Sequence, residues 1–213
     1  MDKDRIDTIY RTKPLEEIPW NMETPPEALV ELVKSGRVRP GRCIDLGCGA
    51  GNYSIYLASQ GFEVTGIDLS PTAISRAQEN AAKKGVHCTF LVADMLADGL
   101  DKVQGTFDFA FDWGVLHHIF PEKRMEYIAQ VHKKLKSGGI YFSACFSEKD
   151  RQFGNSGKYR KTSLGTVLYF SSEDELRELF SRYFTIIDLK TIETQGKSGP
   201  HIMNAALMEK VQE

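Results

Sequence analysis

The sequence lacks the features that are typical of metal-binding, nucleic-acid-binding and membrane proteins. Its four cysteines show no paired spacing of a zinc site or a redox motif, so we expect small buried residues in a reducing compartment. With 27 Lys and Arg against 29 Asp and Glu, the formal charge is −2, and we do not expect a nucleic-acid partner. No apolar stretch is long enough to span a bilayer, and the charged N-terminus leads into no signal-peptide core. We therefore expect a cytoplasmic protein without membrane association.

The sequence also has no internal repeat and no low-complexity tract. A chain of 213 residues, 41% hydrophobic and 26% charged, is long enough for one well-buried core. We expect a single domain over residues 25–213, preceded by an irregular arm or lid over residues 1–24, in a monomer or homodimer.

Strand-like and helix-like segments alternate from about residue 25 onward. Strands are predicted at residues 42–46, 62–68, 86–93, 107–112 and 139–146. Helices are predicted at residues 27–33, 53–60, 71–84, 121–136 and 176–183. Two last strands, 184–193 and 201–209, are joined by a short turn and must be antiparallel. This pattern predicts an α/β fold, a Rossmann-like three-layer sandwich whose mostly parallel seven-stranded sheet ends in an antiparallel hairpin.

A glycine-rich loop, Asp45-Leu46-Gly47-Cys48-Gly49-Ala50-Gly51, follows the first predicted strand. In an open α/β sheet, ligands bind beyond the carboxyl ends of the strands, where this loop is expected. Glycines permit positive φ and close backbone approach, and the next helix offers free N–H groups to an anionic ligand. A tight turn that needs glycine only for packing is the alternative.

Asp68 ends the second predicted strand, where its carboxylate can accept hydrogen bonds from both ribose hydroxyls of an adenosine. A helix N-cap is the rival role, but Ser70 already suits it. An NAD-dependent oxidoreductase would share this acidic residue. The dinucleotide fingerprint Gly-x-Gly-x-x-Gly, counted from Gly47, ends on Asn52 instead of glycine, so the match to NAD is imperfect.

These residues resemble the class I S-adenosylmethionine (SAM)-dependent methyltransferases, whose first motif is acidic-x-Gly-x-Gly-x-Gly. Asp45 to Gly51 fits that motif without a gap, and the resemblance extends over residues 40–146. The other motifs of the family that this sequence matches are Asp68, Ala93-Asp94-Met95, Phe107-Asp108 and Leu135-Lys136-Ser137-Gly138-Gly139. It implies a small-molecule methyltransferase that uses SAM, releases S-adenosylhomocysteine and needs no metal. A SAM-binding module without catalysis is the non-enzymatic alternative.

The resemblance also implies cofactor contacts. Asp94 would hydrogen-bond the adenine amino group, Met95 would offer its backbone amide, and Leu69 would pack on the ring. Asp45, Gly47 and the region of Asp112 would surround the methionine moiety. The predicted cofactor site comprises Tyr10, Asp45, Gly47, Cys48, Gly49, Gly51, Asn52, Asp68, Leu69, Asp94, Met95, Asp112 and Trp113.

On the acceptor side, methyl transfer is an in-line displacement in which the donor is already activated, so alignment can supply much of the rate. His117 and His118 follow the fourth strand, in a segment that faces the sulfonium and acceptor in the resembled family. A histidine with an ordinary pKa of ~6.5 can act as a base at neutral pH, and we take His117 as the candidate. The alternative is that one histidine orders the loop while the other packs or is solvated.

Trp20 is the other catalytic candidate, and Tyr10 accompanies it, because an aromatic face can cover a cofactor and stabilise a sulfonium. A tryptophan that only pins the arm is the alternative. The arm, with Ile18-Pro19-Trp20-Asn21, weakly resembles that of the thiopurine and tellurite-resistance methyltransferases.

Residues 150–169 form a second candidate lid. Their basic side chains could attract an anionic acceptor, although a solvated loop is the alternative; these are Arg151, Lys158, Arg160 and Lys161. Asp112-Trp113-Gly114-Val115 does not match the Asn/Asp-Pro-Pro-aromatic pattern of nucleic-acid amino methylators. The acceptor atom, S, Se, N or O, therefore stays open.

Overall fold

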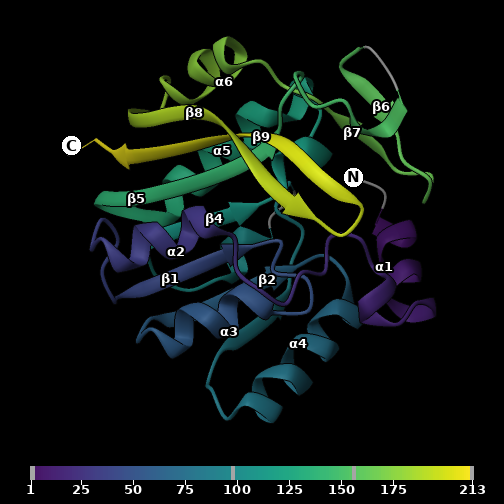
Figure 1. Cartoon of the computed structure of the whole chain (residues 1–213). Helices are drawn as coiled ribbons and strands as arrows, with labels where there is room; N and C mark the ends of the chain where they lie inside the picture. The colour runs from purple at the N-terminus through teal and green to yellow at the C-terminus, as the bar shows by residue number, and fades with distance from the viewer. Residues whose placement is uncertain (1–2, 97–98, 155–156, 212–213) are drawn as a thin grey trace.

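The computed structural model of the chain describes residues 3–96, 99–154 and 157–211. The main sheet contains β1 (Arg42–Leu46), β2 (Glu63–Asp68), β3 (Thr89–Val92), β4 (Phe107–Trp113), β5 (Leu135–Phe146), β8 (Phe184–Gly196) and β9 (Gly199–Lys210). Its strand order is β3-β2-β1-β4-β5-β9-β8 (Figure 1). The first five strands are parallel, whereas β9 runs antiparallel to both neighbours. The predicted sheet with a terminal hairpin is confirmed.

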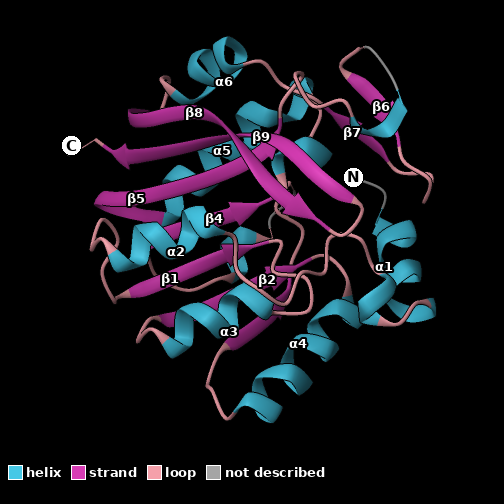
Figure 2. Cartoon of the chain, in the orientation of Figure 1, coloured by secondary structure: helices cyan, strands magenta, loops and turns pink. Residues whose placement is uncertain are grey.

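Helices cover both faces of this sheet (Figure 2). They are α2 (Glu27–Lys34), α3 (Asn52–Ser59), α4 (Pro71–Lys84), α5 (Pro121–Lys134) and α6 (Glu173–Phe180). Successive residues of a strand point to opposite faces. Phe109 and Phe111 of β4 accordingly pack with α2 and α3, and Ala110 packs with α5 and α6. This is the predicted three-layer sandwich.

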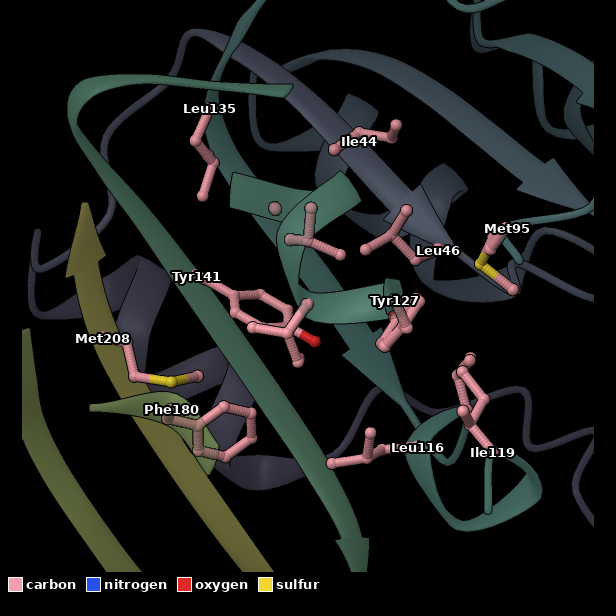
Figure 3. Packing of buried hydrophobic residues seen from close by; sticks show 14 of the residues in the cluster. Ile44, Leu46, Met95, Leu116, Ile119, Tyr127, Leu135, Tyr141, Phe180 and Met208 are labelled. Atoms are coloured by element: carbon pink, nitrogen blue, oxygen red, sulfur yellow. The ribbon is translucent and has the colours of Figure 1, made fainter. Parts of the chain in front are cut away.

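The core between the sheet and α5 is built around two buried tyrosines (Figure 3). Tyr127 of α5 and Tyr141 of β5 lie among apolar side chains that include Ile44 of β1 and Met208 of β9. A buried phenol needs a partner for its hydroxyl. Both hydroxyls donate to Asp112 of β4, which therefore belongs to this core.

The N-terminal arm is not irregular as predicted. It forms α1 (Lys3–Thr12) and the 3₁₀ turn η1 (Leu15–Glu17). Ile6, Ile9 and Tyr10 are spaced three and four residues apart, so they share one helix face, which packs on Leu69 and Ala73. A short helix in a charged segment gains its stability from this packing rather than from its own turns.

Other boundaries also differ from the prediction. Strand β5 begins at Leu135 rather than Gly139, because Leu135 pairs with Phe107 before the register shifts. The last helix covers Glu173–Phe180 rather than residues 176–183. The predicted lid over residues 150–169 contains a hairpin of β6 (Tyr159–Lys161) and β7 (Val167–Tyr169). The remaining 3₁₀ turns are η2 (Leu100–Lys102), η3 (Leu116–His118) and η4 (Gln152–Gly154). None of the helices in the described ranges has the length and apolar character needed to cross a membrane.

Candidate functional site

A cavity of about 660 Å³ opens at the carboxyl ends of β1, β2 and β4. The structure brings most of the predicted site residues to its wall. These are Tyr10, Trp20, Asp45, Gly47, Cys48, Gly49, Asn52, Asp68, Leu69, Met95, Trp113 and His117. The cavity is therefore a composite of the glycine loop, the arm and the segment after β4.

Asp68 connects the glycine loop to the next helix. Its Oδ2 accepts the Gly49 N–H at 3.0 Å, and its Oδ1 accepts the Ser70 N–H at 2.8 Å. Ser70 caps α4 through Ala73, as predicted, so Asp68 is not needed for that role. Burial raises the pKa of Asp68 to about 6. Each carboxylate oxygen keeps a further lone pair for a ligand hydroxyl.

Asp45 is the second buried carboxylate on the cavity wall. It accepts a hydrogen bond from the Ser54 hydroxyl at 2.6 Å. Burial, with Asp68 and Asp112 nearby, raises its pKa to about 7. A ligand ammonium group would favour its ionised form, because an opposite charge stabilises a buried carboxylate.

Three predicted cofactor residues do not line the cavity. Gly51 has φ 81°, and a Cβ there would lie 2.9 Å from Ala77 Cβ, so this glycine serves packing against α4. Asp112 points to the opposite face of β4, into the tyrosine core. Asp94 is exposed after β3, where its Oδ1 accepts the Leu96 N–H at 3.0 Å.

The arm lies directly over the glycine loop. Trp20 donates its indole N–H to the Tyr10 hydroxyl at 2.9 Å. A Cβ on Gly49 would stand only 2.5 Å from that hydroxyl, so glycine is required for this approach. Asn52 donates to the Asn21 side chain at 3.0 Å. Trp20 thus pins the arm as well as lining the cavity.

Further contacts hold the arm at two places along its length. Asp7 accepts hydrogen bonds from the Ser70 hydroxyl at 2.6 Å and from the Thr72 N–H at 3.0 Å. Lys197, in the β8–β9 turn that lies beside the arm (Figure 1), donates to the carbonyls of Leu15 and Ile18. The arm therefore closes one side of the cavity.

The structure makes His117 a poor proton acceptor. Its Nδ1 accepts the Phe146 N–H at 3.4 Å, and its ring stacks on Phe146 at 4.4 Å. Burial places the pKa of His117 well below its ordinary value, and lowers that of His118 to about 4. Since Nδ1 is the acceptor, the proton of the neutral ring belongs on Nε2. Both histidines line the cavity as uncharged groups.

Sequence reasoning missed three residues on the acceptor side: Phe146, Phe153 and His201 all line the cavity. Phe153 has φ 66°, the one positive φ of a non-glycine residue within the described ranges. Such strain in a bulky residue persists only where its surroundings impose it, frequently at binding sites. No local sequence pattern indicates these residues, because they come from separate segments.

The basic side chains of the predicted second lid do not face the cavity. Lys158 pairs with Glu148 and Glu175, and Arg160 donates to backbone carbonyls including that of Asp150. None of the four basic residues lines the wall, which here includes Leu164 and Leu168 instead. These contacts favour the alternative, in which the basic side chains of residues 150–169 do not attract an anionic acceptor. Across the described part of the chain, no three His, Cys, Asp or Glu side chains are grouped to hold a metal.

The buried carboxylates predict a pH-dependent stability of the ligand-free protein. Burial raises the pKa of Asp45 to about 7 and those of Asp68 and Asp112 to about 6. The folded protein therefore keeps protons that the unfolded chain releases above its ordinary carboxyl pKa. The contribution of each of these carboxylates to the free energy of unfolding should fall as pH rises from about 4 to about 7, by up to ~1.4 kcal/mol per pH unit. His117 and His118, whose pKa values burial lowers, contribute a slope of opposite sign below their ordinary pKa of ~6.5.

Urea unfolding at several pH values measures this slope. Asp112→Asn should flatten it, because the amide does not titrate. Asp101→Asn is the control, since that exposed carboxylate pairs with Lys133 on the surface. A slope unchanged in Asp112→Asn would contradict this account of the buried carboxylate.

Comparisons with known proteins identify the family of the chain. A methyltransferase-domain model matches residues 43–139. The 2-heptyl-1-hydroxyquinolin-4(1H)-one methyltransferase of Mycobacteroides abscessus is 29% identical over 192 residues, covering 88% of this chain and 79% of that protein. An uncharacterized methyltransferase of Schizosaccharomyces pombe is 30% identical over 132 residues, covering 62% of this chain and 86% of that protein.

A solved structure has the same fold. A structure described for the conversion of a disulfide bond into a thioacetal group during echinomycin biosynthesis superposes with a TM-score of 0.82 at 26% identity, covering 98% of this chain and 93% of that one. The cofactor of the chain is thus SAM rather than NAD. The chain belongs to the class I SAM-dependent methyltransferases and transfers the methyl group of SAM to a small molecule.

Proposed function

We propose that the methyl acceptor is a flat, apolar aromatic or heteroaromatic molecule that carries a dissociable proton on N, O or S. The observation that carries this proposal is the composition of the acceptor side of the cavity. Its wall there is mainly aromatic and aliphatic: Trp113, Phe146, Phe153, Leu164, Leu168, Ile192 and Met203. Among the described residues, no lysine or arginine lines the cavity.

The charges on the wall support the same class of acceptor. Four carboxylates line the cavity, and a carboxylate or phosphate acceptor would meet them and no cationic side chain of the described residues; they are Asp45, Asp68, Glu27 and Glu193. Burial of an unpaired charge is costly. A neutral ring, in contrast, gains free energy when apolar walls displace water from its faces.

The relative from Mycobacteroides abscessus supports the heteroaromatic class. Its name gives the acceptor as a quinolinone with a hydroxyl on the ring nitrogen. Such a molecule is flat, mostly apolar and carries one dissociable proton. The cavity of the present chain has the wall that a molecule of this kind requires.

We further propose that residues 1–24 act as a lid over the bound cofactor. The Tyr10 hydroxyl lies against Gly49, and the arm is anchored to α4 and to the β8–β9 turn. Cofactor contacts of Asp68, Met95 and Asp94 belong to the same proposal. A cytoplasmic location and a monomer or homodimer stay predictions.

A screen of acceptors tests the proposal. Purified protein and SAM are incubated with hydroxyquinolines, aromatic thiols and heteroaromatic N–H compounds, and with aliphatic carboxylates and alcohols of similar size. We expect kcat/KM, measured by release of S-adenosylhomocysteine, to be at least ~10-fold higher for the ring compounds, which corresponds to ~1.4 kcal/mol of better transition-state binding. Activity confined to aliphatic anions would refute the proposal, as would SAM binding without transfer to any acceptor.

A further inference from the structure

A buried carboxylate orients a histidine on the acceptor side of the cavity. His201, near the start of β9, places its Nδ1 3.2 Å from Oδ2 of Asp150, which follows β5. Asp150 is 3% exposed. Its Oδ2 also accepts the Ile202 N–H at 2.7 Å, and its Oδ1 accepts the Gln152 N–H at 2.6 Å. These contacts hold the carboxylate in one orientation.

This arrangement decides which nitrogen of His201 carries the proton. An ionised carboxylate only accepts hydrogen bonds, so Nδ1 must donate to Asp150. Nε2 of the neutral ring then has the free lone pair. In the described ranges, Nε2 of His201 has no hydrogen-bond partner, and the ring lines the cavity.

The backbone of Gly196 approaches one edge of the His201 ring, where a Cβ would lie 2.8 Å from Nε2. Glycine at position 196 therefore permits the ring to occupy this place beside the turn. The ring is stacked on Phe153 at 5.7 Å with an interplanar angle of 10°. Phe153 also lines the acceptor side, so a flat molecule there would lie near His201.

The two ring nitrogens of His117 have the opposite hydrogen-bonding roles. Its Nδ1 is the acceptor of a backbone N–H, so its Nε2 carries the proton and can only donate. The two cavity histidines therefore present different groups, a lone pair on His201 and an N–H on His117. A base on the acceptor side needs the lone pair.

We propose that His201, oriented by Asp150, is the catalytic residue that removes the proton from the acceptor; the inference rests on the proposed function. As Nε2 takes the proton from the acceptor heteroatom, that atom attacks the methyl carbon. The carbon–sulfur bond of SAM breaks, and its electron pair stays on sulfur to give neutral S-adenosylhomocysteine. The Asp150 carboxylate stabilises the imidazolium until its proton passes to water. Asp150 is a positioning residue and does not contact the acceptor.

Acceptors of graded acidity test this role. In His201→Gln, acceptors still protonated at the assay pH should lose about 100-fold or more in kcat, as is typical for loss of a general base. Acceptors already ionised at that pH should lose less than ~5-fold, because they have no proton to give up. His87→Gln, at an exposed position before β3, is the matched control and should behave as wild type.

The variant Asp150→Asn tests the positioning role of Asp150 through its activity with protonated and with ionised acceptors. Asp150→Asn places an amide beside Nδ1 and removes the charge, so it should lose activity with the protonated acceptors and keep it with the ionised ones. A merely structural effect would slow both groups equally. SAM affinity and the melting temperature of both variants, measured in parallel, show that the cofactor site is intact.

Two results separate this inference from the proposed function. If wild type methylates ring acceptors and His201→Gln slows protonated and ionised acceptors equally, the base assignment is wrong and the proposed function stands. If wild type methylates no ring acceptor, the proposed function fails, and the inference fails with it. A selective loss in His117→Gln rather than His201→Gln would transfer the role to His117.

Discussion

Asp68→Ala is expected to weaken SAM binding by about 100-fold while the protein stays folded. Two ribose hydroxyls that donate to a carboxylate contribute about 3 kcal/mol together, which corresponds to about two powers of ten in affinity. Asp68 also holds Gly49 and Ser70 through their N–H groups, so its loss loosens the loop around the cofactor. Titration calorimetry with SAM measures the effect directly.

The Asp68→Ala protein should stay folded, because the substitution has two opposing effects on the stability of the fold. The substitution removes two hydrogen bonds, but it also removes a buried carboxylate whose raised pKa shows that its ionised form is costly near neutral pH. Asp101→Ala is the control, on the surface turn η2 outside the cavity. A dissociation constant within threefold of wild type in Asp68→Ala would rule out ribose recognition by this residue.

Gly47→Ala is the second substitution with a large expected effect, here on stability. Gly47 has φ 71°, and a Cβ there would lie 2.3 Å from Cγ2 of Val115. A left-handed conformation costs an alanine ~1–2 kcal/mol. Crowding of the buried Val115 adds ~1–3 kcal/mol. We expect the free energy of unfolding to fall by about 2–4 kcal/mol in urea titrations, with SAM binding impaired.

Gly36→Ala separates backbone strain from crowding. Gly36 also has φ 71°, but no atom lies within 4 Å of its added Cβ, so only the backbone cost of ~1–2 kcal/mol applies. Val115→Ala in the Gly47→Ala background should restore part of the stability, because the nearest remaining Val115 atom is Cβ at 3.7 Å. Equal losses in Gly47→Ala and Gly36→Ala, with no recovery in the double variant, would show that crowding contributes nothing.

The cofactor side of the site was predictable because its residues follow the ends of successive strands. Asp45, Gly49 and Asp68 come directly after or within short apolar runs, and parallel strands bring their carboxyl ends to one edge of the sheet. The cap at Ser70 and the terminal hairpin are likewise set by neighbouring residues. Asp112 is the instructive exception: it belongs to the predicted strand, but alternation along β4 turns its carboxylate into the core.

The acceptor side required the tertiary structure. Asp150 and His201 are 51 positions apart and meet because β9 returns beside β5. The arm is helical because its apolar face is buried on Leu69 and Ala73, a partner surface that lies far along the chain. The sequence by itself determined the sheet, the glycine loop and the place of Asp68 at the end of β2, since local periodicity and spacing encode them. Only the tertiary structure decided which histidine offers a lone pair, because that depends on partners brought together by folding.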